Sequence, residues 1–159
     1  MTIDISHNLG ECLNELDGEV AALERKALGA IKRFGVDQMR ELVFGKDTPV
    51  RSGAYAASMD LAVNGISRYK LRVARRGKLH KFRRASKMMA ERQDRLAAAV
   101  WRLSATQGLA GMKSINISNM IPYASLIEFG TKRMKPSGVF AKARMRAEAG
   151  LAKIQGELG

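Results

Sequence analysis

The sequence contains little cysteine, proline or aromatic residue, and it has no long apolar run. It has one cysteine, Cys12, three prolines and 6% aromatic residues among its 159 residues. A single cysteine excludes an internal disulfide, which fits a reducing compartment or a virion assembled in one. No apolar run approaches the roughly 18 residues of a membrane-spanning helix, and the N-terminus lacks the basic and apolar regions of a secretory signal. We therefore expect a protein without membrane contact that is made in the cytoplasm.

Residues that carry catalysis are also scarce. His7 and His80 have no cysteine or carboxylate at ligand spacing, so no zinc site is expected. Residues 108–111 lack the lysine and hydroxyl residue of a phosphate-binding loop, and no serine lies in a nucleophile elbow. Glu128 has no second carboxylate near it in the sequence to form an acid–base pair, so we expect it to make a local hydrogen bond or ion pair. The sequence predicts a protein that is not an enzyme and needs no metal or cofactor.

Positive charge is concentrated in one segment. The chain has 28 Lys and Arg against 15 Asp and Glu, a net charge of +13, and residues 68–95 alone carry twelve basic and two acidic residues, a net charge of +10. Such a segment attracts polyanions, but it lacks the aromatic platform of a single-strand binder and any helix-turn-helix or zinc-finger pattern. It predicts non-specific contact with nucleic acid or with an acidic protein. The residues expected to make this contact are Arg72, Arg75, Arg76, Lys78, Lys81, Arg83 and Arg84.

The first 45 residues predict a long amphipathic helix. From Leu9 to Phe34 apolar residues recur at alternating spacings of four and three, which is a heptad seam of nearly four repeats. After Gly35 shifts the phase, a second stripe continues to about Phe44. The seam fits either a core helix that lies on a sheet or a helix that also packs against a neighbouring subunit, and it is longer than one small domain needs. The expected residues of such a subunit contact are Leu9, Leu16 and Leu23.

The rest of the chain predicts a small, mainly antiparallel sheet with helices. Period-two alternation marks three strands, at residues 58–63, at residues 67–73 after the Asn64-Gly65 turn signal, and at residues 113–118. Residues 75–112 are an insertion with a basic loop and a helix from Ser86 to about Gln107. The apolar stripe of this helix is Met89, Leu96, Val100 and Leu103, with Trp101 off the stripe. The expected fold class is α+β, as one domain over residues 1–159: a long N-terminal helix and a C-terminal helix, from about Val139, pack on the sheet, and an extra basic helix is inserted between strands 2 and 3.

Residues 117–131, ISNMIPYASLIEFGT, combine several turn and helix signals. Asn119 breaks the third strand and Pro122 ends it, because proline cannot donate to a ladder. Proline also suits the first residue of a helix, so residues 123–129 are predicted to form about two helical turns. Gly130 is predicted to end this helix in the left-handed conformation. The segment contains no catalytic motif and is typical of a packing device.

Two segments resemble the sequence boxes of phage tail-completion proteins, the head–tail joining group that includes the minor tail protein Z type. TPVRSGAYAAS at residues 48–58 is similar to the first box and residues 117–131 are similar to the second, in the same order along the chain. Ser52 and Ala54 stand where that family usually has Thr and Arg, and residues 75–112 are longer and more basic than is typical. The residues matched to the family signature are Pro49, Ser52, Gly53, Asn119, Pro122, Tyr123, Glu128, Phe129 and Gly130.

The resemblance implies a structural virion protein without catalytic activity. It implies an α+β subunit that assembles into a ring, expected to be hexameric, at the head–tail junction of the virion. The implied partners are other copies of the chain, the tail terminator or tail tube, and head-connector proteins. In such a ring the basic segment would neutralise phosphates of passing DNA without reading its sequence. The alternative, from the residues alone, is a non-specific nucleic-acid-binding protein that acts through residues 68–95.

Overall fold

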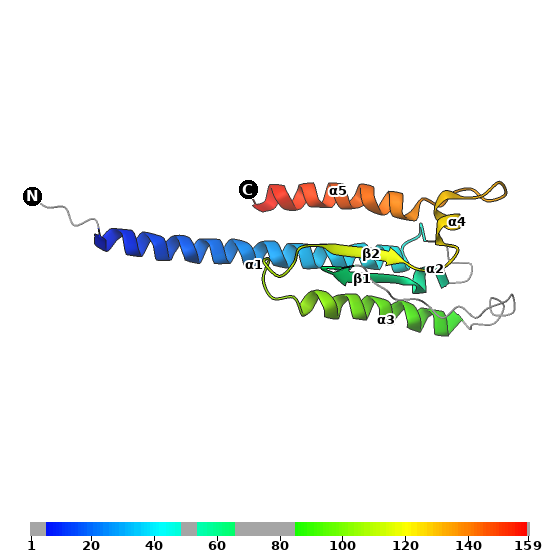
Figure 1. Cartoon of the computed structure of the whole chain (residues 1–159), viewed down its shortest axis with the longest axis horizontal. Helices are drawn as coiled ribbons and strands as arrows, with labels where there is room; N and C mark the ends of the chain where they lie inside the picture. Colours follow the sequence, from blue (N-terminus) through cyan, green and yellow to red (C-terminus); the bar gives the residue numbers. More distant parts are fainter. Residues whose placement is uncertain (1–5, 49–53, 66–84, 159) are drawn as a thin grey trace, which may run out of the picture.

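The computed structural model has an α+β fold in which helices flank a small antiparallel sheet (Figure 1). It describes residues 6–48, 54–65 and 85–158, and the side chains of residues 13–48, 54–65 and 89–158. The described elements are α1 (Ser6–Phe44), α2 (Ala54–Ala57), β1 (Met59–Val63), α3 (Ala85–Ser104), β2 (Ile115–Asn119), α4 (Ala124–Phe129) and α5 (Val139–Leu158). The predicted fold class, with long N-terminal and C-terminal helices and a further helix between strands, is confirmed.

The longest element, α1, is one uninterrupted helix that extends well beyond the rest of the molecule (Figure 1). Its 39 residues span about 58 Å at a rise of about 1.5 Å per residue. The predicted change of phase at Gly35 does not interrupt it. A Cβ at Gly35 would lie 3.1 Å from Leu103 Cδ1 and 3.4 Å from Ile115 Cδ1, so the missing side chain lets α3 and β2 approach the helix closely.

Two antiparallel strands, β1 and β2, form the sheet of the described chain. Leu61 pairs with Ile117 and Val63 pairs with Ile115, which places apolar side chains of both strands on one face. The predicted second strand, residues 67–73, lies outside the described residues. The structure therefore shows the first predicted strand paired with the third.

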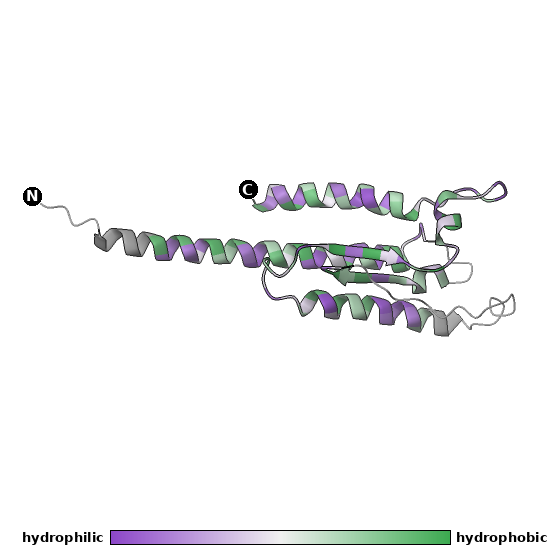
Figure 2. Cartoon of the chain, in the orientation of Figure 1, coloured by the Kyte–Doolittle hydropathy of each residue, from purple (hydrophilic) through white to green (hydrophobic). Residues whose placement is uncertain are grey.

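The core lies where the C-terminal part of α1, α2, β1 and α3 meet. Buried apolar residues of these elements form one core cluster, and Figure 2 shows apolar residues on each of them. The largest fully buried side chains of the core are Met39, Leu42, Val43, Tyr55, Met59, Leu61, Leu103 and Val139. No helix in the described part of the chain is long and apolar enough to cross a lipid bilayer.

The stripe predicted for α3 is partly wrong. Met89 and Val100 are 44% and 41% exposed, whereas Ala99 is fully buried and Arg92 is only 7% exposed. The inward face is therefore rotated away from Val100 and includes an arginine. Trp101, which was predicted to lie off the stripe, is indeed exposed.

Candidate functional site

The two motif segments meet at the side chain of Asn119, the last residue of β2. Its amide nitrogen donates a hydrogen bond to the Tyr55 carbonyl oxygen (2.9 Å), and its side-chain oxygen accepts one from the Ile121 backbone N–H (3.1 Å). The same oxygen lies within hydrogen-bond distance of the buried Ser58 hydroxyl. An amide suits this position because it carries a donor and an acceptor on one group. One side chain thus ties the segment at residues 48–58 to the segment at residues 117–131.

The short helix α2 brings the first segment into the core. All four of its residues, Ala54–Ala57, are buried. Burial raises the pKa of the Tyr55 phenol above its ordinary value, and the negative charge of Glu128 adds to this effect. Thr48, at the start of the segment, is also buried and donates its hydroxyl to the Leu42 carbonyl oxygen (2.8 Å). The three residues of this segment that match the family signature lie outside the described residues; these are Pro49, Ser52 and Gly53.

The corner after β2 is a tight turn rather than the start of a helix. The Ala124 backbone N–H donates to the Ile121 carbonyl oxygen (3.0 Å), with Pro122 as the second residue of the turn, where its fixed φ fits. The prediction that Pro122 opens the helix is wrong, because α4 begins two residues later at Ala124. Tyr123 is the third residue of the turn, is half-buried and packs against the core.

Glu128 fixes α4 to the start of α5. Its carboxylate accepts hydrogen bonds from the backbone N–H groups of Phe140 (Oε2, 3.1 Å) and Ala141 (Oε1, 3.0 Å). The first N–H groups of a helix have no partner within the helix, and the partial positive charge there favours a carboxylate. The Gly138 N–H also donates to the Glu128 carbonyl oxygen (3.3 Å). Glu128 is hydrogen-bonded, as expected, but its partners belong to the next helix.

Gly130 allows the sharp exit from α4. It has φ 75° and ψ −174°, which is an extended conformation with positive φ and not the left-handed helical conformation that was predicted. A Cβ here would lie 2.6 Å from the Met134 carbonyl oxygen and 2.7 Å from Pro136 N, so a larger residue does not fit. The neighbouring Phe129, also matched to the family signature, is 80% exposed. Its side chain therefore contributes to the surface and not to the core.

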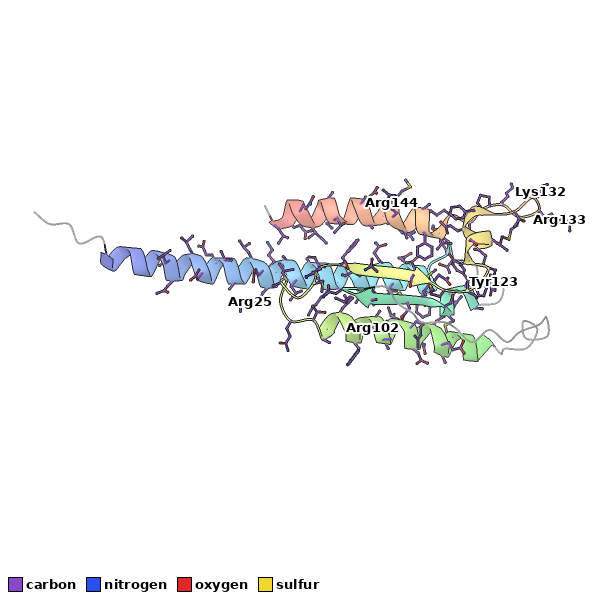
Figure 3. The ribbon with its side chains drawn as sticks, in the orientation of Figure 1. Arg25, Arg102, Tyr123, Lys132, Arg133 and Arg144 are labelled. Carbon is purple, nitrogen blue, oxygen red and sulfur yellow. The ribbon has the colours of Figure 1, made fainter. Side chains whose placement is uncertain are left out.

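The basic residues divide between the surface and the interior. Lys132 and Arg133 are exposed at the tip of the loop between α4 and α5, and Figure 3 shows them pointing away from the body. Residues 85–95 of the basic segment are described, as part of α3, but the residues predicted to contact DNA all lie outside the described residues. These residues are Arg72, Arg75, Arg76, Lys78, Lys81, Arg83 and Arg84.

A buried ion-pair cluster that sequence reasoning missed lies between β1 and α3. Asp60, which is 1% exposed, lies 2.8 Å from Arg102 Nη1 and 3.6 Å from Arg95 Nη1. Arg92 lies one turn before Arg95; burial lowers the pKa of its guanidinium, and its Nε and Nη2 have no hydrogen-bond partner in the part of the chain that is described. Arg92 and Arg95 belong to the segment of net charge +10, yet their side chains are directed to the interior of the protein. The only signal in the sequence was an aspartate inside an apolar strand.

The N-terminal half of α1 carries an apolar stripe that the described chain leaves uncovered. Its members are each between 51% and 55% exposed: Leu13, Leu16, Val20 and Leu23. Figure 2 shows apolar residues recurring along this projecting part of the helix. The body ends near Lys26, whose Nζ donates to the Glu157 carbonyl oxygen (2.9 Å) close to the end of α5. Two of the residues predicted to make a subunit contact, Leu16 and Leu23, are therefore on the surface, while the side chain of Leu9 lies outside the described ones.

An open apolar groove of about 540 Å³ runs between α1, β2 and α5. The helices α1 and α5 lie alongside each other in Figure 1 and form its two long walls. Its large apolar lining residues are Ile31, Phe34, Leu42, Met112, Ile115, Ile117, Phe140 and Leu151. The charged residues that line it are both basic, Lys113 and Arg144. The groove and the stripe are both apolar and both accessible within the described part of the chain.

No protein-family model, curated protein or solved structure matches this chain. The likeness to tail-completion proteins therefore depends on the two sequence segments. Within the described residues, no three His, Cys, Asp or Glu side chains lie close enough together to hold a metal ion. The polar groups of Asn119, Glu128 and Asp60 form hydrogen bonds and ion pairs within the chain. These contacts hold neighbouring elements together.

Proposed function

We propose that the chain is a structural subunit of a tailed-phage virion. In this role it is a tail-completion or neck component that joins the tail tube to the head connector as a ring around the DNA channel. The observation that carries the proposal is the junction at Asn119. The two segments that resemble the tail-completion boxes are far apart in the sequence, yet they share hydrogen bonds there, and Glu128 extends the same framework to α5. Asn119 and Glu128, two of the matched residues, thus join the two segments and α5 in one framework.

A second observation supports assembly into a larger structure. The stripe on the N-terminal half of α1 exposes four large apolar residues in a row along one helix face. Monomeric soluble proteins rarely expose extended apolar patches, and such patches mark interaction surfaces. A ring subunit has to offer a surface to each neighbour. The projecting half of α1 offers a surface of this kind.

The test uses virions of the phage that carries the gene. We expect mass spectrometry to detect the protein in purified particles and immunogold labelling to locate it at the head–tail junction. Deletion of the gene should yield separate heads and tails, which join when the purified protein is added. Complementation with the wild-type gene is the control. Absence of the protein from purified virions, or joined and infectious particles after deletion, would refute the proposal.

A second candidate is a non-specific nucleic-acid-binding protein, which the net charge of +10 over residues 68–95 favours. Two of these charges, on Arg92 and Arg95, are directed to the interior, so the surface charge is smaller than the count. A gel-shift assay with the purified chain should show binding that weakens steeply with salt. Binding that is lost on replacing four arginines by glutamine, together with absence from virions, would favour this candidate. The four arginines are Arg75, Arg76, Arg83 and Arg84.

A further inference from the structure

We infer that the N-terminal half of α1 docks into the groove between α1, β2 and α5 of a second copy of this chain. The stripe on α1 and the groove agree in length, are both apolar, and carry opposite charges around them. The inference rests on the proposed function for its biological setting, because this contact would link neighbouring subunits of the ring. Its two surfaces, however, are features of the chain itself and can be tested on the purified protein.

The groove cannot be filled by the stripe of the same copy. The stripe, residues 13–23, and one wall of the groove, residues 31–42, belong to one uninterrupted helix. The stripe would reach its own groove only if α1 broke and folded back. Its partner therefore comes from another molecule.

The lengths of the two surfaces agree. At a helical rise of about 1.5 Å per residue, the stripe from Leu13 to Leu23 is about 15 Å long. The groove wall on α1 from Ile31 to Leu42 and the wall on α5 from Phe140 to Leu151 are each about 16 Å long. An amphipathic helix that lies in an apolar groove uses anchors at spacings of three and four residues, which is the spacing of the stripe.

Charge also favours this pairing. Residues 13–24 carry four acidic side chains and no lysine or arginine, whereas the charged residues that line the groove are Lys113 and Arg144. Arg144 pairs with Glu148 at 2.9 Å, but the two side chains are 81% and 63% exposed. Such surface pairs contribute little to stability, so Arg144 is free to exchange its partner for an acidic residue of an incoming helix.

The same charges oppose a symmetric pairing of two α1 helices through their stripes. With the four apolar residues of the stripe at heptad positions a and d, Asp17 and Glu24 occupy e and Glu19 occupies g. In a parallel pair, g of one helix faces e of the other; in an antiparallel pair, e faces e and g faces g. Every close charge pair in this segment would then be acidic in either arrangement. The basic groove of a second copy avoids this repulsion.

A contact between two different surfaces is heterologous. Each copy would give one helix and accept one, so the contact can be repeated around a closed ring, or along a filament where the rotation does not close. The contact therefore has the symmetry that a ring around a channel requires.

The experiment measures self-association of the purified full chain by sedimentation velocity over a range of concentrations. Leu16→Gln/Val20→Gln removes the anchors of the helix, and Ser114→Glu/Leu151→Glu puts acidic residues into the groove. Both double variants should associate at least about tenfold more weakly than the wild type, because each removes buried apolar contact. Met145→Gln is the matched control, since Met145 is 70% exposed on α5 and does not line the groove. It should associate as the wild type does, and circular dichroism should show the same helix content for all four proteins.

Mixing the two double variants is the decisive step. The helix variant keeps an intact groove and the groove variant keeps an intact helix, so the mixture should form a one-to-one dimer that neither protein forms alone. Three results would overturn the inference: a wild type that stays monomeric up to its solubility limit, a helix variant that associates as well as the wild type, or a mixture that forms no dimer. Because the assay needs no phage, its failure is distinguishable from absence of the protein from virions, which would overturn the proposed function alone.

Discussion

Removal of the Glu128 carboxylate should detach the start of α5 from α4. In Glu128→Ala the N–H groups of Phe140 and Ala141 lose their acceptors, which lie at 3.1 and 3.0 Å. Ala141 is exposed and water can replace its partner, but Phe140 is half-buried, so its N–H is replaced less well. Loss of a helix cap costs about 0.5–2 kcal/mol, and loss of a negative charge at a helix N-terminus costs a further 0.3–1 kcal/mol or so. We therefore expect Glu128→Ala to lower the free energy of unfolding by about 2 kcal/mol.

Glu128→Gln distinguishes the contribution of the negative charge to stability from that of the hydrogen bonds. The amide keeps one acceptor oxygen and loses the charge, so we expect a loss of about 1 kcal/mol. For a chain of this size, 1 kcal/mol shifts the melting temperature by about 2–4 °C. The order of stability should be wild type, Glu128→Gln, Glu128→Ala.

Urea unfolding followed by far-ultraviolet circular dichroism measures these differences. The variants should be compared in the Leu16→Gln/Val20→Gln background and at one protein concentration, because association would add to the apparent stability. Glu148→Gln is the control, since Glu148 forms an exposed ion pair on the same helix and its loss should change stability by less than about 0.5 kcal/mol. A midpoint for Glu128→Ala that equals the midpoint of Glu148→Gln would show that the carboxylate does not hold α5.

Three further substitutions have expected outcomes in the same assay. Asn119→Ala removes the amide that joins the two motif segments and leaves the N–H of the buried Ile121 without its acceptor, so it should cost about 1–3 kcal/mol. Gly130→Ala should cost at least about 2 kcal/mol, because its φ is 75° and the new Cβ would lie 2.6 Å from a carbonyl oxygen. A hydrogen bond from a lysine of α5 lowers the pKa of Asp47. The contribution of Asp47 to stability is therefore complete above the ordinary pKa of an aspartate and is lost as the pH falls through the lowered pKa, so Asp47→Asn should flatten this part of the pH profile.

Each of these three predictions has its own control. Asn116→Ala removes an exposed amide of β2 and should cost less than about 1 kcal/mol; an equal cost for Asn119→Ala would contradict its role as a junction. Gly18→Ala lies in open space on α1 and should stabilise the helix by about 0.5–1 kcal/mol, in contrast to Gly130→Ala. For Asp47, wild type and variant should converge in stability at the acid end of the profile, and a constant difference across the whole profile would exclude the ion pairs as its cause.

Helix positions could be predicted from the sequence because the apolar residues of a helix recur at the spacing of its turns. This spacing alone predicted α1 as far as Phe44 and the start of α5 at Val139. The third predicted strand and the short helix after Pro122 also appear close to their expected places, as β2 and α4. These elements depend on local backbone rules, which a single sequence carries.

Contacts between elements could not be predicted in this way. Arginine is normally counted as a surface residue, so the predicted stripe of α3 passed through Val100 and missed Arg92. A long arginine stem can be buried, as that of Arg92 is, and the neighbouring Arg95 and Arg102 of α3 pair with the Asp60 carboxylate on β1. Glu128 was likewise expected to bond locally, but its partners are N–H groups that only the packed fold brings to it. Side-chain contacts between elements can be predicted only once the packing of those elements is known.

The cap at Glu128 and the groove meet at α5, and this gives a prediction that links folding to assembly. Glu128 fixes the start of α5, and Phe140, one of the residues it holds, lines the groove. If the groove receives α1 of a second copy, then Glu128→Ala should weaken self-association under conditions where the chain is still folded, although Glu128 itself does not line the groove. Met145→Gln, on the same helix and outside the groove, should leave association unchanged. Sedimentation velocity in the absence of urea measures both, and full association of Glu128→Ala would show that the groove does not depend on how α5 is anchored.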